Sequence, residues 1–296
     1  MQTAVLLALL MALITASSNI LLKKGFTRLN PFPVSFFSVL LSAVFLWLTT
    51  FCTGGKTYFS CRAGITVFVV IGIFAPPLVR TLTYYGIHTL GAGRSAPLRA
   101  LTPFFAVLIA IRMLGESPGP PIFAGIALII AGTMLITREQ GDSANYRKIH
   151  LLYPMCAALL AGLAANLRKY GLGIMPHPVF ASAVAATSAS VCMSVYVLCR
   201  KGKYLPEMKE FFVHRRESAY IVSAALLTSM GEITDLGSLL YGRVSLVVPI
   251  FAVTPLATLL LSRVFLRRHE RITRKIIFSA LLIIAGVYIA VLHASP

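Results

Sequence analysis

The chain has 296 residues, of which 57% are hydrophobic and 12% are charged, and its mean hydropathy is +0.83. A soluble domain carries about 25% charged residues, so this composition excludes a water-soluble globular protein and indicates a polytopic membrane protein. The net charge of +18 would suggest nucleic-acid binding in a soluble protein. Here the basic residues fall between apolar runs, where they face anionic lipid head groups, so we expect membrane lipids and no nucleic acid as partners.

Ten apolar runs follow one another along the chain, each long enough to cross a hydrocarbon core of about 30 Å as a helix. They occupy residues 3–22, 34–52, 64–86, 91–113 and 120–137, and then 150–168, 178–199, 218–241, 243–266 and 274–293. The predicted fold class is therefore all-α, with ten transmembrane helices. The fourth and ninth runs contain prolines that we expect to kink the helices: Pro97, Pro103, Pro249 and Pro255.

The second five runs repeat the first five. Pro97 and Thr102-Pro103 recur as Pro249 and Thr254-Pro255, 152 residues later (249 − 97), and Ile129–Gly132 recurs as Ile283–Gly286. The chain is therefore expected to consist of two five-helix repeats, residues 1–140 and 148–296. Because five is an odd number, the repeats must cross the membrane in opposite directions. Inverted repeats of this kind are typical of secondary transporters, with a binding site near the bilayer midplane.

Loop charges predict an orientation. The loops after spans one, five, seven and nine carry 17 of the 27 Lys and Arg residues, and those after spans two, four, six and eight carry 6. The positive-inside rule places the first set of loops in the cytoplasm and both termini outside.

These features resemble the drug/metabolite transporter superfamily, specifically the EamA type, which has two tandem five-helix repeats. In that family each repeat ends with a Pro-containing fourth helix, an L-G-E-like loop and an A-G-containing fifth helix. Leu114-Gly115-Glu116 and Ala131-Gly132 match this pattern, while the second half keeps Glu270 but has Arg268-His269 before it. The resemblance implies a transporter with both termini in the cytoplasm, opposite to the loop charges. It does not single out a substrate, because relatives are associated with amino acids, sugars, nucleotide precursors and cationic drugs.

Glu116 and Glu270 occupy the acidic position of this family pattern in their loops. We interpret both as residues that cap a helix or order a loop, and not as substrate ligands.

Two acids lie well inside a span, where a charge costs about 2.5–3.5 kcal/mol unless it is paired or hydrated. They are Glu232 and Asp235, which share one face of the eighth helix. The 152-residue offset pairs Glu232 with Arg80 and Asp235 with Thr83, so the repeat could bring Arg80 towards Glu232. One hypothesis is that these residues line the pathway, with a carboxylate that exchanges a proton or binds a cation. The other is a buried salt bridge that locks spans three and eight without touching substrate.

Four further residues are candidates for substrate binding, each with a structural alternative. Arg99 could bind a carboxylate or phosphate through its planar fork, or extend to the membrane interface. Tyr84 could bind substrate, but a tyrosine near a span end is more often an interface anchor. Asn19 and Asn166 could face the pathway or bridge two helices.

No motif indicates an enzyme, an ATP-driven pump, a cofactor or a metal site, and the five cysteines are scattered. The sequence predicts a multi-pass integral membrane protein, in the plasma (inner) membrane if the source is bacterial. We expect a secondary transporter, as a monomer or homodimer, that moves a small organic metabolite by alternating access, with protons as a candidate coupling ion. A zwitterionic or anionic solute is favoured. The alternatives are a flippase for a phosphorylated lipid carrier head group and an exporter of cationic drugs.

Overall fold

The computed structural model describes residues 1–25, 31–90, 95, 98–138, 148–200, 205–266 and 274–293, and these contain helices but no strand. In the first repeat, α3 and α4 are joined by the single π-helical turn η2, and together they form the third span. The first repeat contains α1 (Gln2–Gly25), α2 (Pro31–Cys52), η1 (Gly55–Ser60), α3 (Arg62–Phe74), η2 (Ala75–Val79), α4 (Arg80–Leu90), α6 (Thr102–Met113) and α7 (Pro120–Arg138).

In the second repeat, α12 and α13 are joined by the 3₁₀ turn η4 and together form the ninth span. The elements are η3 (Lys148–Leu151), α8 (Leu152–Ile174), α9 (Pro178–Cys199), α10 (Leu205–Val213), α11 (Arg215–Tyr241), α12 (Val244–Ile250), η4 (Phe251–Val253), α13 (Thr254–Leu266) and α14 (Arg274–Leu292). Within the described residues, each of the ten predicted spans is represented by helix, in the predicted order.

Length and apolar composition mark five helical stretches of the described chain as able to cross a membrane. They are Gln2–Leu22, Phe32–Cys52, Arg62–Thr83, Ile149–Ile174 and Pro178–Cys199. Four shorter apolar stretches, within α6, α7, α12–α13 and α14, add further candidates. The remaining span, α11, is 27 residues long and contains both Glu232 and Asp235.

Packing between the repeats follows a pseudo-two-fold pattern. Span one packs on span eight (α1 on α11), as span six packs on span three (α8 on α3 and α4). Span two packs on span eight (α2 on α11), as span seven packs on span three (α9 on α3). The second spans contact each other (α2 with α9), and so do the fifth spans (α7 with α14). This is the arrangement that an inverted repeat requires, and it confirms the predicted fold class.

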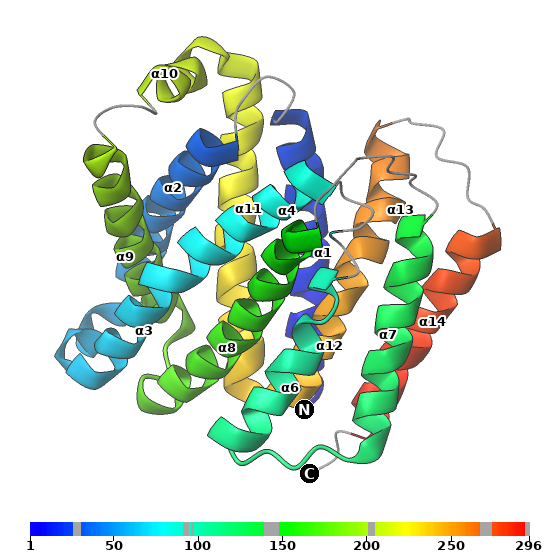
Figure 1. Ribbon diagram of the computed structural model, residues 1–296. Helices are drawn as coiled ribbons and strands as arrows, with labels where there is room; N and C mark the ends of the chain where they lie inside the picture. Colours follow the sequence, from blue (N-terminus) through cyan, green and yellow to red (C-terminus); the bar gives the residue numbers. More distant parts are fainter. Residues whose placement is uncertain are drawn as a thin grey trace.

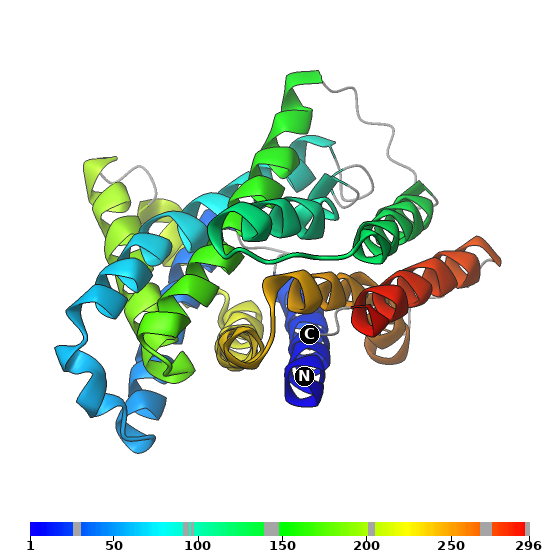
Figure 2. The ribbon, with the colours of Figure 1, turned by 90° about the horizontal axis from the view of Figure 1, so that it is seen from below.

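The N-terminus and the C-terminal end of α14 lie at the same end of the molecule, where α6, α8 and α11 also end (Figure 1). We call this end the terminus face and the opposite end, where α10 lies, the distal face. Figure 2 looks onto the terminus face and shows α7 and α14 side by side at one edge of the bundle.

The contact between α7 and α14 shows the pseudo-symmetry at the level of single residues. A Cβ atom on Gly125 would lie 2.5 Å from the carbonyl oxygen of Gly286, and one on Gly132 would lie 2.8 Å from that of Ser279. The 154-residue offset between Gly132 and Gly286 also relates Gly125 to Ser279, so the two contacts are symmetry equivalents. Small residues let helix backbones approach this closely in a membrane, which explains the glycine of the repeated Ile-Ile-Ala-Gly sequence.

The helices break at prolines. Pro249 is the penultimate residue of α12, and η4 follows that helix directly. Pro255 is the second residue of α13, and Pro103 is the second residue of α6. Pro97 lies outside the described residues. A break that the sequence reading missed is η2, because its two consecutive prolines, Pro76 and Pro77, lie in a run that was read as one continuous helix.

The basic loop that the sequence predicts between the seventh and eighth spans, residues 200–217, contains the nine-residue helix α10. The ring of Phe211 in α10 stacks on that of Phe37 in α2, with centroids 4.0 Å apart. This apolar contact attaches α10 to the bundle, so the basic composition concealed an amphipathic helix.

Candidate functional site

The centre of the molecule contains an ion pair between the two repeats. Arg80, the first residue of α4, places Nη2 3.5 Å from Oε1 of Glu232 in α11. Residues at equivalent positions of a two-fold arrangement can meet only at its axis. Because Arg80 and Glu232 are related by the 152-residue repeat offset, their pair marks the pseudo-two-fold axis.

The π-helical turn positions Arg80. The backbone N–H of Arg80 donates to the carbonyls of Pro76 and Pro77, which close the turn immediately before it. Single π turns within α-helices are frequent at functional sites. The turn therefore sets the position from which the Arg80 side chain reaches α11.

A second ion pair lies one helical turn further along α11. Nη1 of Arg168 in α8 is 2.6 Å from Oδ2 of Asp235. The side chain of Asp235 is 6% exposed, and its other oxygen, Oδ1, is buried and has no hydrogen-bond partner among the described residues. Sequence reasoning missed Arg168 because it ended the sixth span there and counted Arg168 and Lys169 as loop residues. In the structure α8 continues to Ile174, so both lie inside the helix.

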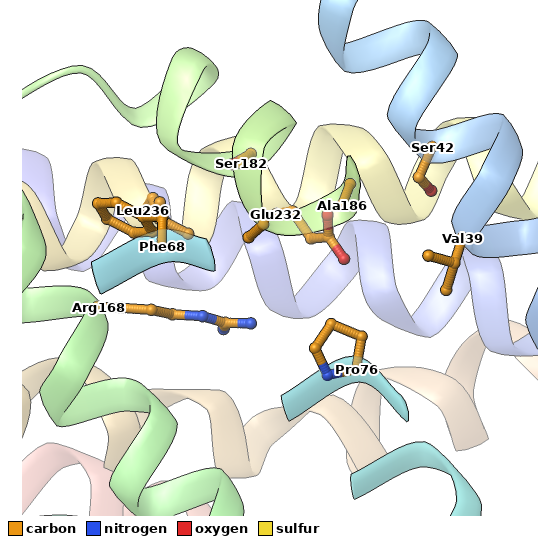
Figure 3. A pocket seen from close by; sticks show the side chains of 10 residues that line it. Val39, Ser42, Phe68, Pro76, Arg168, Ser182, Ala186, Glu232 and Leu236 are labelled. Carbon is orange, nitrogen blue, oxygen red and sulfur yellow. The ribbon is translucent and has the colours of Figure 1, made fainter. Parts of the chain in front are cut away.

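Arg168 and Glu232 line the same small central cavity, together with serines from α2 and α9 (Figure 3). The side chain of Arg168 extends from α8 into this space, between Phe68 and Pro76. The cavity volume is about 20 Å³, which is enough for about one water molecule. Its full lining is Val39, Ser42, Phe68, Pro76, Arg168, Ser182, Ala185, Ala186, Glu232 and Leu236.

The polar groups around this cavity can both donate and accept hydrogen bonds. The guanidinium groups of Arg80 and Arg168 are donors, and their side chains keep 22% and 24% of their surface exposed. Ser182 is 3% exposed, and its hydroxyl oxygen has no partner among the described residues. The site can therefore bind an anionic group through its arginines and a donor group through Glu232 and Ser182.

The other predicted residues are divided between this region and the surface. Nη1 of Arg99 donates to Oγ1 of Thr83, which lies almost one turn beyond Arg80 on α4. This contact brings a third guanidinium group close to the helix that carries Arg80. Asn19 is exposed on α1 and is not part of the central cluster. The Tyr84 side chain lies outside the described part of the chain.

Asn166 is fully buried and connects two helices. Its Nδ2 donates to the carbonyls of Ala106 in α6, at 2.9 Å, and Gly162 in α8, at 2.8 Å. Gly162 permits the close approach, because a Cβ atom there would lie 2.8 Å from the backbone nitrogen of Ala106. The structure therefore supports the helix-bridging interpretation of Asn166.

Glu116 caps a helix of the opposite repeat, as predicted. Its carboxylate accepts hydrogen bonds from the backbone N–H groups of Val244 at 2.7 Å and Ser245 at 2.9 Å, at the start of α12. Gly115 adopts the left-handed conformation, with φ of 67°, which turns the chain after α6 and aims Glu116 at α12. Glu270 lies outside the described residues.

A wider vestibule of about 510 Å³ opens beside Glu116 on the terminus face. Its basic side chains are Lys169 and Arg243. Nζ of Lys169 donates to the carbonyl of Leu239 at 2.7 Å, in the last turn of α11. Within the described residues, no group of three or more His, Cys, Asp or Glu side chains is arranged to hold a metal ion.

Comparison with known proteins follows the same two-part division of the chain. The model of the EamA-like transporter family matches residues 2–138 and 148–292. No curated protein sequence matches. A solved crystal structure is similar over 99% of this chain and 98% of its own, with a TM-score of 0.76 at 16% sequence identity. At that identity the similarity shows a shared fold.

Proposed function

Because the chain belongs to the EamA-like transporter family, it is a membrane transporter of the drug/metabolite superfamily, and we propose that it is a secondary carrier. It moves a small zwitterionic or anionic organic solute across the membrane by alternating access. The observation that carries this proposal is the pair of guanidinium groups, Arg80 and Arg168, beside the central cavity at the pseudo-two-fold axis.

Two arginines at this depth favour a solute with a carboxylate or phosphate. The guanidinium fork forms two parallel hydrogen bonds with such a group. The contact between Arg80 and Glu232 is long, at 3.5 Å, so an anionic group of a solute can compete with Glu232 for Arg80. The opposing carboxylates keep the empty site close to neutral, which limits the free energy of burying its charges.

The size of the cavity supports a mechanism with a large conformational change. Sites for drug-sized ligands measure about 300–1,000 Å³, whereas the central cavity measures about 20 Å³. A solute can bind only if the helices around the cavity separate. The inverted repeat provides the geometry for such a motion, because the two halves can exchange conformations around the axis.

The same lining favours a soluble solute over the alternatives. A lipid flippase needs a cavity that opens to the bilayer, for instance between spans three and four, but α6 contributes no residue to this lining. An exporter of cations needs acids free to bind a cation. Here Glu232 and Asp235 each have an arginine partner.

The test is a thermal-stability screen of the protein in mild detergent against carboxylates, sugar phosphates, nucleosides and lipophilic cations. A ligand at 100 times its dissociation constant adds about 2.7 kcal/mol to the free energy of unfolding. We expect an anionic or zwitterionic compound to stabilise the protein, and Arg80→Gln or Arg168→Gln to abolish the shift. Arg216→Gln, on the exposed first turn of α11, is the matched control and should leave it unchanged.

Counterflow in proteoliposomes with the radiolabelled compound then tests transport. Stabilisation by lipophilic cations alone, dependent on Glu232 or Asp235, would refute the proposed solute class in favour of an exporter of cations. Stabilisation only by a phosphorylated lipid would refute it in favour of a flippase.

A further inference from the structure

We propose that the two central ion pairs have different tasks, an inference that rests on the proposed carrier function. Glu232, on the axis, takes up and releases the proton that couples transport. The Arg168–Asp235 pair holds the terminus face closed.

The two carboxylates differ in how firmly they are held. Glu232 is 23% exposed, lines the cavity and has an arginine partner at 3.5 Å. Asp235 is 6% exposed, does not line the cavity and has its partner at 2.6 Å. A proton from water can reach a carboxylate that faces a cavity large enough for a water molecule. The accessible carboxylate is therefore Glu232.

The two ion pairs also differ in their relation to the repeat symmetry. Because Arg80 and Glu232 are equivalent residues of the two repeats, their pair stays at the axis when the repeats exchange conformations. A group at the axis can therefore be exposed first to one face of the membrane and then to the other. Asp235 is instead equivalent to Thr83. Asn19 in span one has its counterpart in Asn166 of span six, and the same offset (166 − 19) relates Arg168 to Leu21. The distal face therefore has no copy of the Arg168–Asp235 pair.

This asymmetric pair lies on the terminus-face side of the axis. From Glu232, α11 continues through Asp235 towards its end at Tyr241, which lies on the terminus face (Figure 1). The hydrogen bond from Lys169 to the carbonyl of Leu239 lies further in this direction. The hydrogen bonds by which Glu116 caps α12 follow it. Three successive contacts thus join α8, α11, α12 and the loop after α6. Of the residues that make them, Arg168 lines the cavity, whereas Lys169 and Glu116 line the vestibule.

The charges around Glu232 specify how a proton and a solute are coupled. The charged groups that act on it are Arg80, Arg168 and Asp235, while the lining residues from α2 and α9 are uncharged. When an oxygen of Glu232 accepts a proton from water, the carboxylate loses its negative charge and Arg80 loses its counter-ion. Arg80 is then free to bind the anionic group of the solute. Release of the solute and of the proton to water on the other side restores the Arg80–Glu232 pair.

The net charge at the axis is the same in the empty and in the loaded carrier. The empty carrier has one positive and one negative charge there, and the loaded carrier has Arg80 with the solute's anionic group beside a neutral Glu232. Because charge is costly in the low-dielectric membrane interior, keeping the sum at zero lets both forms change conformation. If the solute's anionic group bound Arg80 while Glu232 was still ionised, the site at the axis would carry one excess negative charge. This charge disfavours movement of the solute without a proton.

The Arg168–Asp235 pair is suited to a gate because it is only partly satisfied. Oδ1 of Asp235 is buried and has no hydrogen-bond partner in the part of the chain that the structure describes, so the pair does not recover all the desolvation free energy of its charges. It closes the terminus face but can be opened.

Infrared spectroscopy of proteoliposomes tests the role of Glu232 without a known solute. The probe is the protonated-carboxyl stretching band, followed in difference spectra as the pH of the buffer is changed. We expect a band that titrates in the wild type, in Asp235→Asn and in the control Glu210→Gln on the exposed face of α10, but not in Glu232→Gln. Persistence of the band in Glu232→Gln would overturn the assignment. If Asp235→Asn does not fold, the Glu232→Gln spectrum alone decides.

Cysteine labelling tests the gate. Ser238 is fully buried in α11, almost one turn beyond Asp235, and Ser238→Cys is made in a background that lacks the five native cysteines. A membrane-impermeant thiol reagent applied at the terminus face should label it slowly. Arg168→Gln should raise the labelling rate by about 100-fold or more, the change that removal of one partner of a buried ion pair produces in an equilibrium. The charge swap of Arg168→Asp with Asp235→Arg should restore slow labelling.

Equal labelling rates with and without Arg168→Gln would overturn the gate. Fast labelling that the charge swap does not reverse would do the same, because it indicates general loosening of the fold. Neither measurement uses a solute, so failure of the coupling proposal is distinguishable from failure of the carrier proposal.

Discussion

Replacement of Glu116 by alanine removes a contact that joins the two halves of the transporter. The carboxylate of Glu116, in the loop after α6, is the hydrogen-bond acceptor for two consecutive backbone N–H groups, those of Val244 and Ser245. Val244 is fully buried and Ser245 is 3% exposed. In Glu116→Ala these two donors lose their partner at the point where α12 begins.

The expected loss follows from the two bonds. A hydrogen bond to a charged group contributes about 1.5–3 kcal/mol, so the two together set an upper limit of about 6 kcal/mol. Because the vestibule beside Glu116 admits water, part of this is recovered by hydration of the freed N–H groups. We expect Glu116→Ala to lower the free energy of unfolding by about 3 kcal/mol. Glu116→Gln, whose amide oxygen can still accept one bond, should lose about half as much.

The assay is equilibrium unfolding in mixed micelles, with helix content and tryptophan fluorescence followed as the denaturing detergent is increased. Glu210→Ala removes an exposed acid from α10 and serves as the matched control, which should unfold like the wild type. Wild-type stability in Glu116→Ala would refute the capping role. Equal destabilisation by the alanine and glutamine variants would refute the bond-by-bond estimate.

Three further predictions concern packing and orientation. Gly125→Ala should destabilise the protein by about 1–3 kcal/mol, because its Cβ atom would lie 2.5 Å from the carbonyl oxygen of Gly286. Gly173→Ala is the control: a Cβ atom there would have no atom within 4 Å, so this variant should be neutral or stabilising in the same assay. Asn166→Ala should lower stability by about 1–3 kcal/mol because it leaves the carbonyl of Ala106 buried without its donor; stability equal to wild type would show that water replaces the amide. The loop charges predict that a cysteine in an N-terminal tag of intact cells reacts with an impermeant thiol reagent, and labelling only after cell lysis would instead support the cytoplasmic termini that the family resemblance implies.

The repeat made the axis pair predictable from sequence. The offset fixed by Pro97 and Pro249 relates Arg80 to Glu232, and the structure places these two side chains in contact. The interpretation of Glu116 as a capping residue came instead from its position in the loop pattern of the family, and its carboxylate does accept hydrogen bonds from two otherwise unpaired backbone N–H groups at the start of α12.

The partner of Asp235 was not predictable by those means. Hydropathy sets the end of a span where charges begin, so the sixth span was ended at Arg168 and its charge was assigned to the following loop, whereas α8 continues to Ile174. A charge inside a helix is tolerated when tertiary structure supplies its counter-charge, and that counter-charge lies 67 residues away in sequence, on α11. The π turn at Pro76 and Pro77 was missed for a related reason. Apolar composition describes how much a segment is buried, but not the path of its backbone.

The axis pair has a consequence for the origin of the chain. An assembly of two identical five-helix subunits, inserted in opposite directions, would place the same residue on both sides of the axis. Copies of the first repeat would bring two arginines together, and copies of the second would bring two glutamates together. A pair of opposite charges at that point requires two halves that differ, and a single polypeptide permits this because its two repeats can have different residues where identical charges would repel.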